Sequence, residues 1–127
     1  MTGHTGGCLC GAVRYVIDGP IGDSVACHCS QCRKNSGHYW SSSQAPVAAL
    51  RLSSADSLTW YRSSATAKRG FCTVCGSSLF WEMDGEGMIS VASGTLDTPT
   101  GTRTKKHIFT ADKADYYDLP DSEVQIP

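Results

Sequence analysis

The sequence predicts a fold made mainly of β-strands and stabilised by metal-binding cysteines. Several short segments alternate apolar and polar side chains, which is the period of a half-buried strand. Turn residues separate these segments at a spacing that is typical of all-β domains. Helical periodicity is weak, and the seven cysteines form three groups with the spacing of metal ligands. These observations favour a small β fold that contains metal sites.

The predicted strands follow one another along the chain. The segment GAVRYVI at 11–17 places Val13, Tyr15 and Ile17 on one face. The other predicted strands span 38–43, 48–52, 57–62, 77–83 and 87–93. A hairpin is predicted at Asp84-Gly85, because glycine adopts the positive φ that tight turns need. Helical turns at 30–35 and 113–117 are too short to change the predicted fold class.

Length and composition predict one domain over residues 1–127. A chain of 127 residues suits a single core, and no repeat or composition break marks a linker. No apolar run reaches the length of about 18 residues that spans a bilayer, and the start MTGHTGGC lacks the regions of a signal peptide. An odd number of cysteines cannot pair completely as disulfides. We therefore expect a cytoplasmic protein whose thiols bind metal.

The charge balance argues against nucleic acid and membrane surfaces as partners. Eleven Lys and Arg residues oppose twelve Asp and Glu residues, which gives a net charge of −1. Such a chain has no overall basic field to attract polyanions. The patch formed by Arg103, Lys105 and Lys106 is too small to change this expectation. A small-molecule partner is the better hypothesis, and the sequence leaves the oligomeric state open.

Four cysteines have the spacing of a structural zinc site. Cys8 and Cys10 are two residues apart, so on extended chain their sulfurs face the same side. Cys72 and Cys75 form a C-x-x-C turn, which the following glycine helps to close. Two such pairs far apart in sequence make one tetrahedral site, and binding there would join the start of the chain to its middle.

The remaining three thiols, Cys27, Cys29 and Cys32, suggest a functional metal site. Three protein ligands plus one exchangeable position is the pattern of functional zinc sites. Spacing alone leaves other groupings of the seven cysteines open. With this division we expect two zinc ions per chain, and nearby cations such as Arg33, Lys34 and Arg69 could offset the thiolate charge.

Basic and histidine residues near the triplet are candidate substrate ligands. Arg33 and Lys34 directly follow Cys32 and could bind an anion, although a solvated turn is the alternative. His38 could be a fourth metal ligand or a proton shuttle, and His107 could contact substrate, although structural roles are favoured for both. His28 should point away from the metal, since Cys27 and Cys29 on either side of it face the metal and successive side chains of extended chain point to opposite sides.

The combined pattern resembles the glutathione-dependent formaldehyde-activating (GFA) enzyme family, which includes the centromere protein V group. The resemblance covers nearly the whole chain in the order of the family, and one departure is Tyr116, where the family pattern has Trp. The matching segments are GGCLCGAVRY (6–15), CHCSQCRKNSG (27–37), RGFCTVCGSSLFW (69–81), SGTLD (93–97), HIF (107–109) and YYDLPD (116–121).

The resemblance implies an Mss4-like fold of small twisted antiparallel sheets around a structural zinc site. It implies a domain core at about 4–119, followed by a C-terminal tail at 120–127. It implies structural zinc on Cys8, Cys10, Cys72 and Cys75, and a second zinc on the triplet. In the family this second site is associated with glutathione as co-substrate and with the addition of formaldehyde to its thiol.

Three functions follow as hypotheses. The first is a zinc-dependent carbon–sulfur lyase that forms or releases the glutathione adduct of formaldehyde or a related small aldehyde. The second is a non-catalytic carrier of glutathione or of a thiol conjugate. The third is a protein-interaction module in which both zinc ions are structural. A triplet with only three clustered thiols favours the first two hypotheses over the third.

Overall fold

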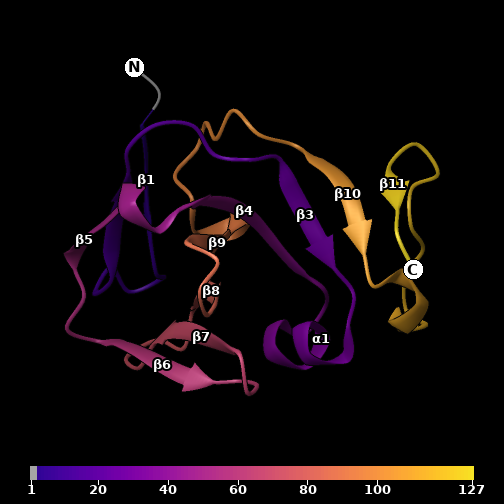
Figure 1. Ribbon diagram of the computed structural model, residues 1–127, viewed down its shortest axis with the longest axis horizontal. Helices are drawn as coiled ribbons and strands as arrows, with labels where there is room; N and C mark the ends of the chain where they lie inside the picture. Colours follow the sequence, from indigo (N-terminus) through magenta and orange to yellow (C-terminus); the bar gives the residue numbers. More distant parts are fainter. Residues whose placement is uncertain (1–2) are drawn as a thin grey trace.

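The computed structural model describes residues 3–127 as two β-sheets with one short α-helix (Figure 1). The helix is α1 (Ser30–Ser36), and short 3-10 turns occur at η1 (Val47–Ala49), η2 (Ser93–Thr95) and η3 (Thr110–Asp112). The strands are β1 (His4–Gly7), β2 (Arg14–Ile17), β3 (Ser24–Cys27), β4 (Trp40–Pro46), β5 (Leu50–Ser54), β6 (Leu58–Arg62), β7 (Ala67–Cys72), β8 (Ser78–Met83), β9 (Met88–Ala92), β10 (Thr104–Ile108) and β11 (Val124–Gln125). The predicted mainly β fold is confirmed.

The larger sheet brings distant parts of the chain side by side. Its eight strands lie in the order β11-β10-β3-β4-β9-β8-β7-β6, and the smaller sheet has the order β1-β2-β5. Most neighbours are antiparallel, but β10 is parallel to both β3 and β11. The predicted tail at 120–127 therefore includes a strand, which forms the edge of the larger sheet beside β10.

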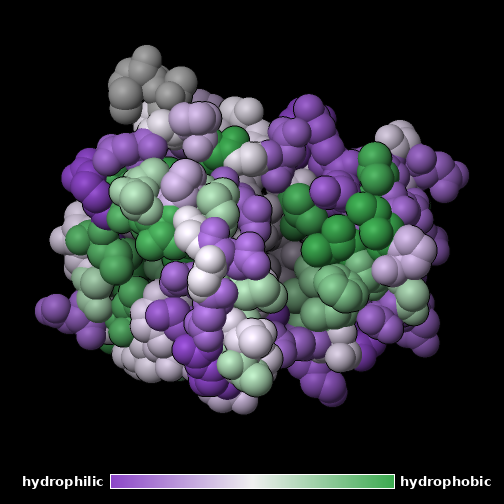
Figure 2. Space-filling view, viewed as in Figure 1, coloured by the Kyte–Doolittle hydropathy of each residue, from purple (hydrophilic) through white to green (hydrophobic). Residues whose placement is uncertain are grey.

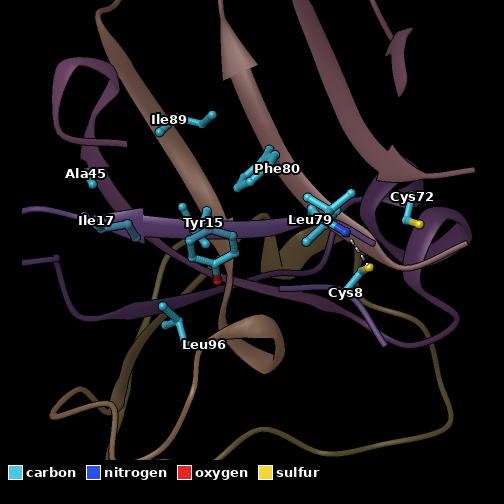
Figure 3. Close-up of a cluster of buried hydrophobic side chains, with 11 residues drawn as sticks. Cys8, Tyr15, Ile17, Ala45, Cys72, Leu79, Phe80, Ile89 and Leu96 are labelled. Carbon is cyan, nitrogen blue, oxygen red and sulfur yellow. Dashed lines mark hydrogen bonds between the residues drawn. The ribbon is translucent and has the colours of Figure 1, made fainter. Parts of the chain in front are cut away.

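The core lies where the two sheets meet (Figure 3). Val13, Tyr15 and Ile17 are fully or almost fully buried, as their alternation predicts. The Tyr15 ring packs edge-on against Phe80, with ring centroids 5.5 Å apart, and its hydroxyl lies 2.8 Å from Oγ1 of Thr95. These contacts connect the small sheet to β8 of the large sheet and hold the first strands in place.

The strand β1 lies so close to Tyr15 that it requires glycine. A Cβ atom on Gly6 would lie 2.3 Å from the Tyr15 hydroxyl and 2.4 Å from the backbone oxygen of Thr95. No side chain fits in that space. The Gly6-Gly7 pair therefore lets β1 approach the core before the chain reaches Cys8.

The helix α1 is capped by a cysteine. Its N-cap is Cys29, whose Sγ accepts a hydrogen bond from the backbone N–H of Cys32 at 3.3 Å. It ends at Gly37, which has a left-handed φ of 88° and donates its N–H to the carbonyl of Arg33 at 2.8 Å. The cap ties the start of the helix to the cysteine triplet.

Several predicted boundaries differ from the structure. The strand predicted at 11–17 begins only at Arg14, because a turn through Gly11, with a φ of 81°, precedes it. The strand predicted at 48–52 begins at Leu50, after η1. The helical turn predicted at 113–117 is wrong, and a 3-10 turn forms just before it. The Asp84-Gly85 turn is confirmed, with Gly85 at a φ of 78°. No helix within residues 3–127 is long and apolar enough to cross a membrane.

Candidate metal and thiol site

The first cysteine cluster contains the two predicted pairs. The sulfurs of Cys8, Cys10, Cys72 and Cys75 all lie within 4.8 Å of one another. Cys8 and Cys10 follow β1, Cys72 ends β7, and Cys75 lies in the turn before β8. The spacing therefore predicted the correct grouping, and the cluster joins the two sheets at one point.

The distances in this cluster suit a tetrahedral metal ion. The Cys10 sulfur lies 3.6 Å from that of Cys8 and 3.7 Å from that of Cys72. Four thiolates about 2.3 Å from one zinc ion would be about 3.8 Å apart. A disulfide requires a sulfur separation of about 2.05 Å, so these thiols are not oxidised pairs. The donor set and its spacing fit zinc.

Hydrogen bonds lower the pKa of two thiols in this cluster, Cys72 and Cys75. The backbone N–H of Val13 donates to Cys8 Sγ at 3.2 Å (Figure 3). The Ser77 hydroxyl lies 3.2 Å from Cys75 Sγ, and its hydrogen bond lowers the pKa of Cys75 to about 5. Donors around a sulfur stabilise the charged form that metal ions bind.

The second cluster gathers the predicted triplet. The sulfurs of Cys27, Cys29 and Cys32 lie within 4.8 Å of one another, and no fourth His, Cys, Asp or Glu among residues 3–127 joins them. Cys27 ends β3, Cys29 caps α1, and Cys32 lies in its first turn. A strand end followed at once by a helix start is what brings three sulfurs together within six residues. Three thiols at this separation can also bind zinc.

A buried arginine contacts the triplet. Nη2 of Arg69, on β7, lies 3.3 Å from Cys32 Sγ. A hydrogen bond with the Cys27 thiol, together with this arginine, lowers the pKa of Cys32 to about 6. The same thiol pair raises the pKa of Cys27. The surroundings of Cys32 therefore favour its thiolate form.

The triplet opens into a cavity of about 790 Å³. Its wall includes all three cysteines, the side chain of Arg69 and the exposed cations Lys105 and Lys106. Most of the remaining wall is apolar, with the rings of Trp40 and Trp81 close to the thiols. Figure 2 shows apolar residues over β3 and β10, beside a hollow next to β4. The cavity is large enough for a ligand the size of a small peptide.

None of the four residues predicted to bind substrate lines this cavity. Arg33 and His38 line neither this cavity nor a neighbouring one of about 390 Å³, which contains Lys34. His38 is exposed and packs against the tyrosine rings of residues 39, 116 and 117, so it does not approach the thiols as a metal ligand. A role of these residues in substrate binding stays a prediction.

His107 is buried behind the thiol site rather than in its cavity. Its Nδ1 lies 2.8 Å from Nε2 of His28, and its Nε2 lies 2.6 Å from a carboxylate oxygen of Glu123. His28 also bonds through Nδ1 to the Tyr117 hydroxyl. Both histidines are at most 3% exposed. The expectation that His28 points away from the metal is confirmed, and its hydrogen bonds lie behind β3.

Sequence reasoning named Arg69 only as one of several nearby cations and missed its contact with the triplet. Its position in RGFC, on a strand that ends at a ligand of the other cluster, was the available signal. That strand, β7, carries Cys72 to the first cluster and Arg69 to the second. The two sites are therefore linked through one strand.

Comparisons with known proteins agree with this geometry. The family model for the glutathione-dependent formaldehyde-activating enzyme matches residues 3–112. The crystal structure of a Rhodobacter sphaeroides protein is similar, with a TM-score of 0.64 and 26% sequence identity. The match covers 97% of this chain and 99% of that chain. The residues matched by the family model include all seven cysteines of this chain.

Proposed function

Because this chain belongs to the glutathione-dependent formaldehyde-activating enzyme family, we propose that it is a zinc-dependent carbon–sulfur lyase. Its substrates would be glutathione and formaldehyde or a related small aldehyde. The observation that carries the proposal is the thiol triplet of Cys27, Cys29 and Cys32. These three sulfurs converge on a cavity wall, and residues 3–127 supply no fourth His, Cys, Asp or Glu donor.

The two clusters have different roles in this proposal. Zinc on the four-cysteine cluster is structural, since its four protein ligands leave no position for a substrate. Zinc on the triplet is functional, since three protein ligands leave one exchangeable position. When bound there, zinc lowers the pKa of an incoming thiol and so keeps it ionised at neutral pH.

The donor set favours thiol chemistry over hydrolysis. Three thiolates and one zinc ion carry a formal charge of −1 as a unit, so such a centre activates water less well than one with three neutral histidines. A sulfur ligand suits this centre better than a water molecule. This is why we assign a thiol adduct as the substrate rather than a hydrolysable bond.

The reaction conserves atoms and electrons without a further cofactor. The thiolate sulfur of glutathione attacks the aldehyde carbon, a carbon–sulfur bond forms, and the carbonyl π electrons move to oxygen. The proton that the thiol lost on ionisation returns through solvent to this oxygen and converts it to a hydroxyl group, so that thiol and aldehyde together give the adduct. The reverse sequence releases aldehyde and thiol. The cavity walls formed by Trp40 and Trp81 would exclude water around the reacting sulfur.

Residues of the chain balance the charge of the three thiolates and fix the positions of their sulfurs. Arg69 donates to Cys32 and so keeps the negative charge of the thiolates balanced inside an apolar cavity. The rigid strand β3 and the start of α1 fix the three sulfurs. A pre-organised set of this kind avoids reorganisation when a thiol enters.

Exchange NMR tests the proposal directly. The uncatalysed addition of glutathione to formaldehyde is itself appreciable, so an equilibrium assay would mislead. The rate of exchange between free glutathione and its hydroxymethyl adduct should rise in proportion to the concentration of zinc-loaded protein. The Cys29→Ser variant is the control and should not raise that rate. If the parent protein leaves the exchange rate at the uncatalysed value, catalysis is excluded and the carrier hypothesis replaces it.

A further inference from the structure

Arg69 is an unusual residue within the part of the chain that the structure describes. It is the only Lys, Arg, Asp or Glu among residues 3–127 that is buried, with 4% exposure. Charged side chains are almost never buried unless they are paired. Yet no Asp or Glu carboxylate of residues 3–127 lies within 4 Å of its guanidinium. The protein therefore buries a full positive charge without giving it a carboxylate.

The contacts of Arg69 leave one nitrogen unused. Nε donates to the side-chain oxygen of Gln31 at 2.9 Å, and Nη2 donates to Cys32 Sγ at 3.3 Å. Nη1 is buried and has no hydrogen-bond partner among residues 3–127. A buried donor without a partner is destabilising, and the penalty is greater for a charged group. A ligand that accepts a hydrogen bond from Nη1 is the most direct explanation for this unpaired donor.

The surroundings of Arg69 are suited to a ligand. Arg69 and Gln31 belong to the walls of both the thiol cavity and the neighbouring cavity that contains Lys34. The guanidinium thus stands between two spaces, and it packs over the ring of Trp40 at 5.4 Å from the ring centroid. Apolar surroundings strengthen the attraction between the guanidinium and an anion.

The charge of the site points to the same kind of ligand. A zinc ion with three thiolates is formally −1, and an incoming thiolate would make the unit more negative. A thiol that also carried a carboxylate would then be repelled unless a cation lay next to the site. Arg69 is the cation that directly touches a sulfur of the triplet.

We propose that Nη1 of Arg69 binds a carboxylate of the thiol ligand, so that the site selects thiols that carry an acidic group. Arginine binds carboxylates in a planar, directional manner that lysine does not reproduce. This inference rests on the proposed function, since it assumes that a thiol enters beside the triplet. It adds the group of the thiol that is recognised, a carboxylate, and it assigns this recognition to Arg69 rather than to Arg33.

Matched pairs of thiols test the proposal by binding rather than by turnover. The protein would be loaded with cobalt, and thiol binding would be followed by the sulfur-to-cobalt absorption band. The first pair is 3-mercaptopropionate and 1-propanethiol, and the second is glutathione and its glycyl ethyl ester. Ionic strength of about 0.15 M would screen the exposed lysines of the cavity. The glycyl ester keeps the γ-glutamyl carboxylate, so that pair tests the glycyl carboxylate alone. In at least one pair, the parent should bind the member with the extra carboxylate about tenfold more tightly than the member without it.

Variants then assign the preference to one side chain. Arg69→Met should bring the affinity ratio close to one. Arg62→Met is the matched control, because Arg62 is exposed on β6, pairs with Asp84 and lines neither cavity, and it should keep the ratio of the parent. Arg69→Lys keeps the charge without the planar fork and should lower the ratio severalfold. It provides the test if the methionine variant does not fold.

The outcomes separate this inference from the proposed function. If thiols bind but the parent shows no preference in either pair, the assignment of Arg69 is overturned while the thiol site stands. A preference that persists in both Arg69 variants also overturns it. If none of the thiols changes the cobalt spectrum, the proposed function itself fails.

Discussion

Nε2 of His28 lies 2.8 Å from Nδ1 of His107, which places two buried imidazoles in direct contact behind the strand that carries Cys27. One arrangement of protons satisfies every hydrogen bond in this series of four side chains while both imidazole rings are neutral. The Tyr117 hydroxyl donates to His28, His28 donates to His107, and His107 donates to the carboxylate of Glu123. This relay links the C-terminal segment to the back of the thiol site.

The histidine pair predicts a pH dependence with a definite sign. Burial lowers the pKa of His28 from 6.5 to about 4. The unfolded chain therefore binds a proton that the folded chain does not. The contribution of His28 to the free energy of unfolding is complete above about pH 6.5, and it is lost as the pH falls toward 4. An NMR titration of the His28 ring should show a neutral imidazole down to about pH 4. A midpoint near 6.5 would contradict the buried neutral pair.

The metal content of the purified protein is the second prediction. The division of the thiols into four and three predicts close to two zinc ions per chain, because each cluster has the sulfur spacing of one site. Elemental analysis of protein purified without chelators would measure this ratio. One zinc ion or none would count against the division of the cysteines.

Replacing a thiol of the four-cysteine cluster should unfold the protein. Cys72 is fully buried at the junction of both sheets, and a structural zinc contributes a folding free energy on the order of 10 kcal/mol. We expect Cys72→Ser to be insoluble or to lack a cooperative thermal transition. Cys29→Ser is the matched control. Serine is itself a good N-cap, so α1 should remain intact in that variant. A soluble Cys72→Ser protein with the melting temperature of the parent would remove the structural assignment.

Because β1 packs closely against Tyr15, we predict that adding a single methyl group at Gly6 lowers the stability of the fold. Gly6→Ala should lower the free energy of unfolding by about 1–3 kcal/mol, because its Cβ would overlap Tyr15 and the backbone of Thr95. Gly94→Ala is the control, since a Cβ there would meet no atom within 4 Å. Denaturant titrations of both variants would measure the difference. Equal stability of the two would show that β1 is not packed as described.

Local patterns in the sequence predicted part of the fold. Alternation identified β2, where Tyr15 and Ile17 share a buried face with Val13 just before the strand, and the Asp84-Gly85 signal identified the turn before β9. Alternation failed for β7, because its AKRGFC sequence buries a charged side chain and a glycine. The strands β3 and β10 were also missed. They are short, and their parallel pairing joins segments about 80 residues apart, which no local pattern reveals.

The site shows the same division between local and long-range information. Cysteine spacing predicted both clusters, since ligand geometry constrains residues that are two or three positions apart. Proximity in sequence suggested Arg33 and Lys34 as the cations of the site. The cavity wall instead takes its buried cation from Arg69, which β7 places there through sheet pairing. His107 likewise has a hydrogen-bond partner, Glu123, that lies on the last segment of the chain and that no local pattern links to it.

The exchangeable fourth position beside Cys27, Cys29 and Cys32 is the central claim, and cobalt substitution tests it most directly. Adding glutathione should intensify the sulfur-to-cobalt charge-transfer band, because a fourth sulfur enters the triplet site. The Cys29→Ser variant should remain folded and should lose this response. An unchanged cobalt spectrum at saturating glutathione, together with a Cys29→Ser variant that binds glutathione as tightly as the parent, would contradict the open site and favour the interaction module.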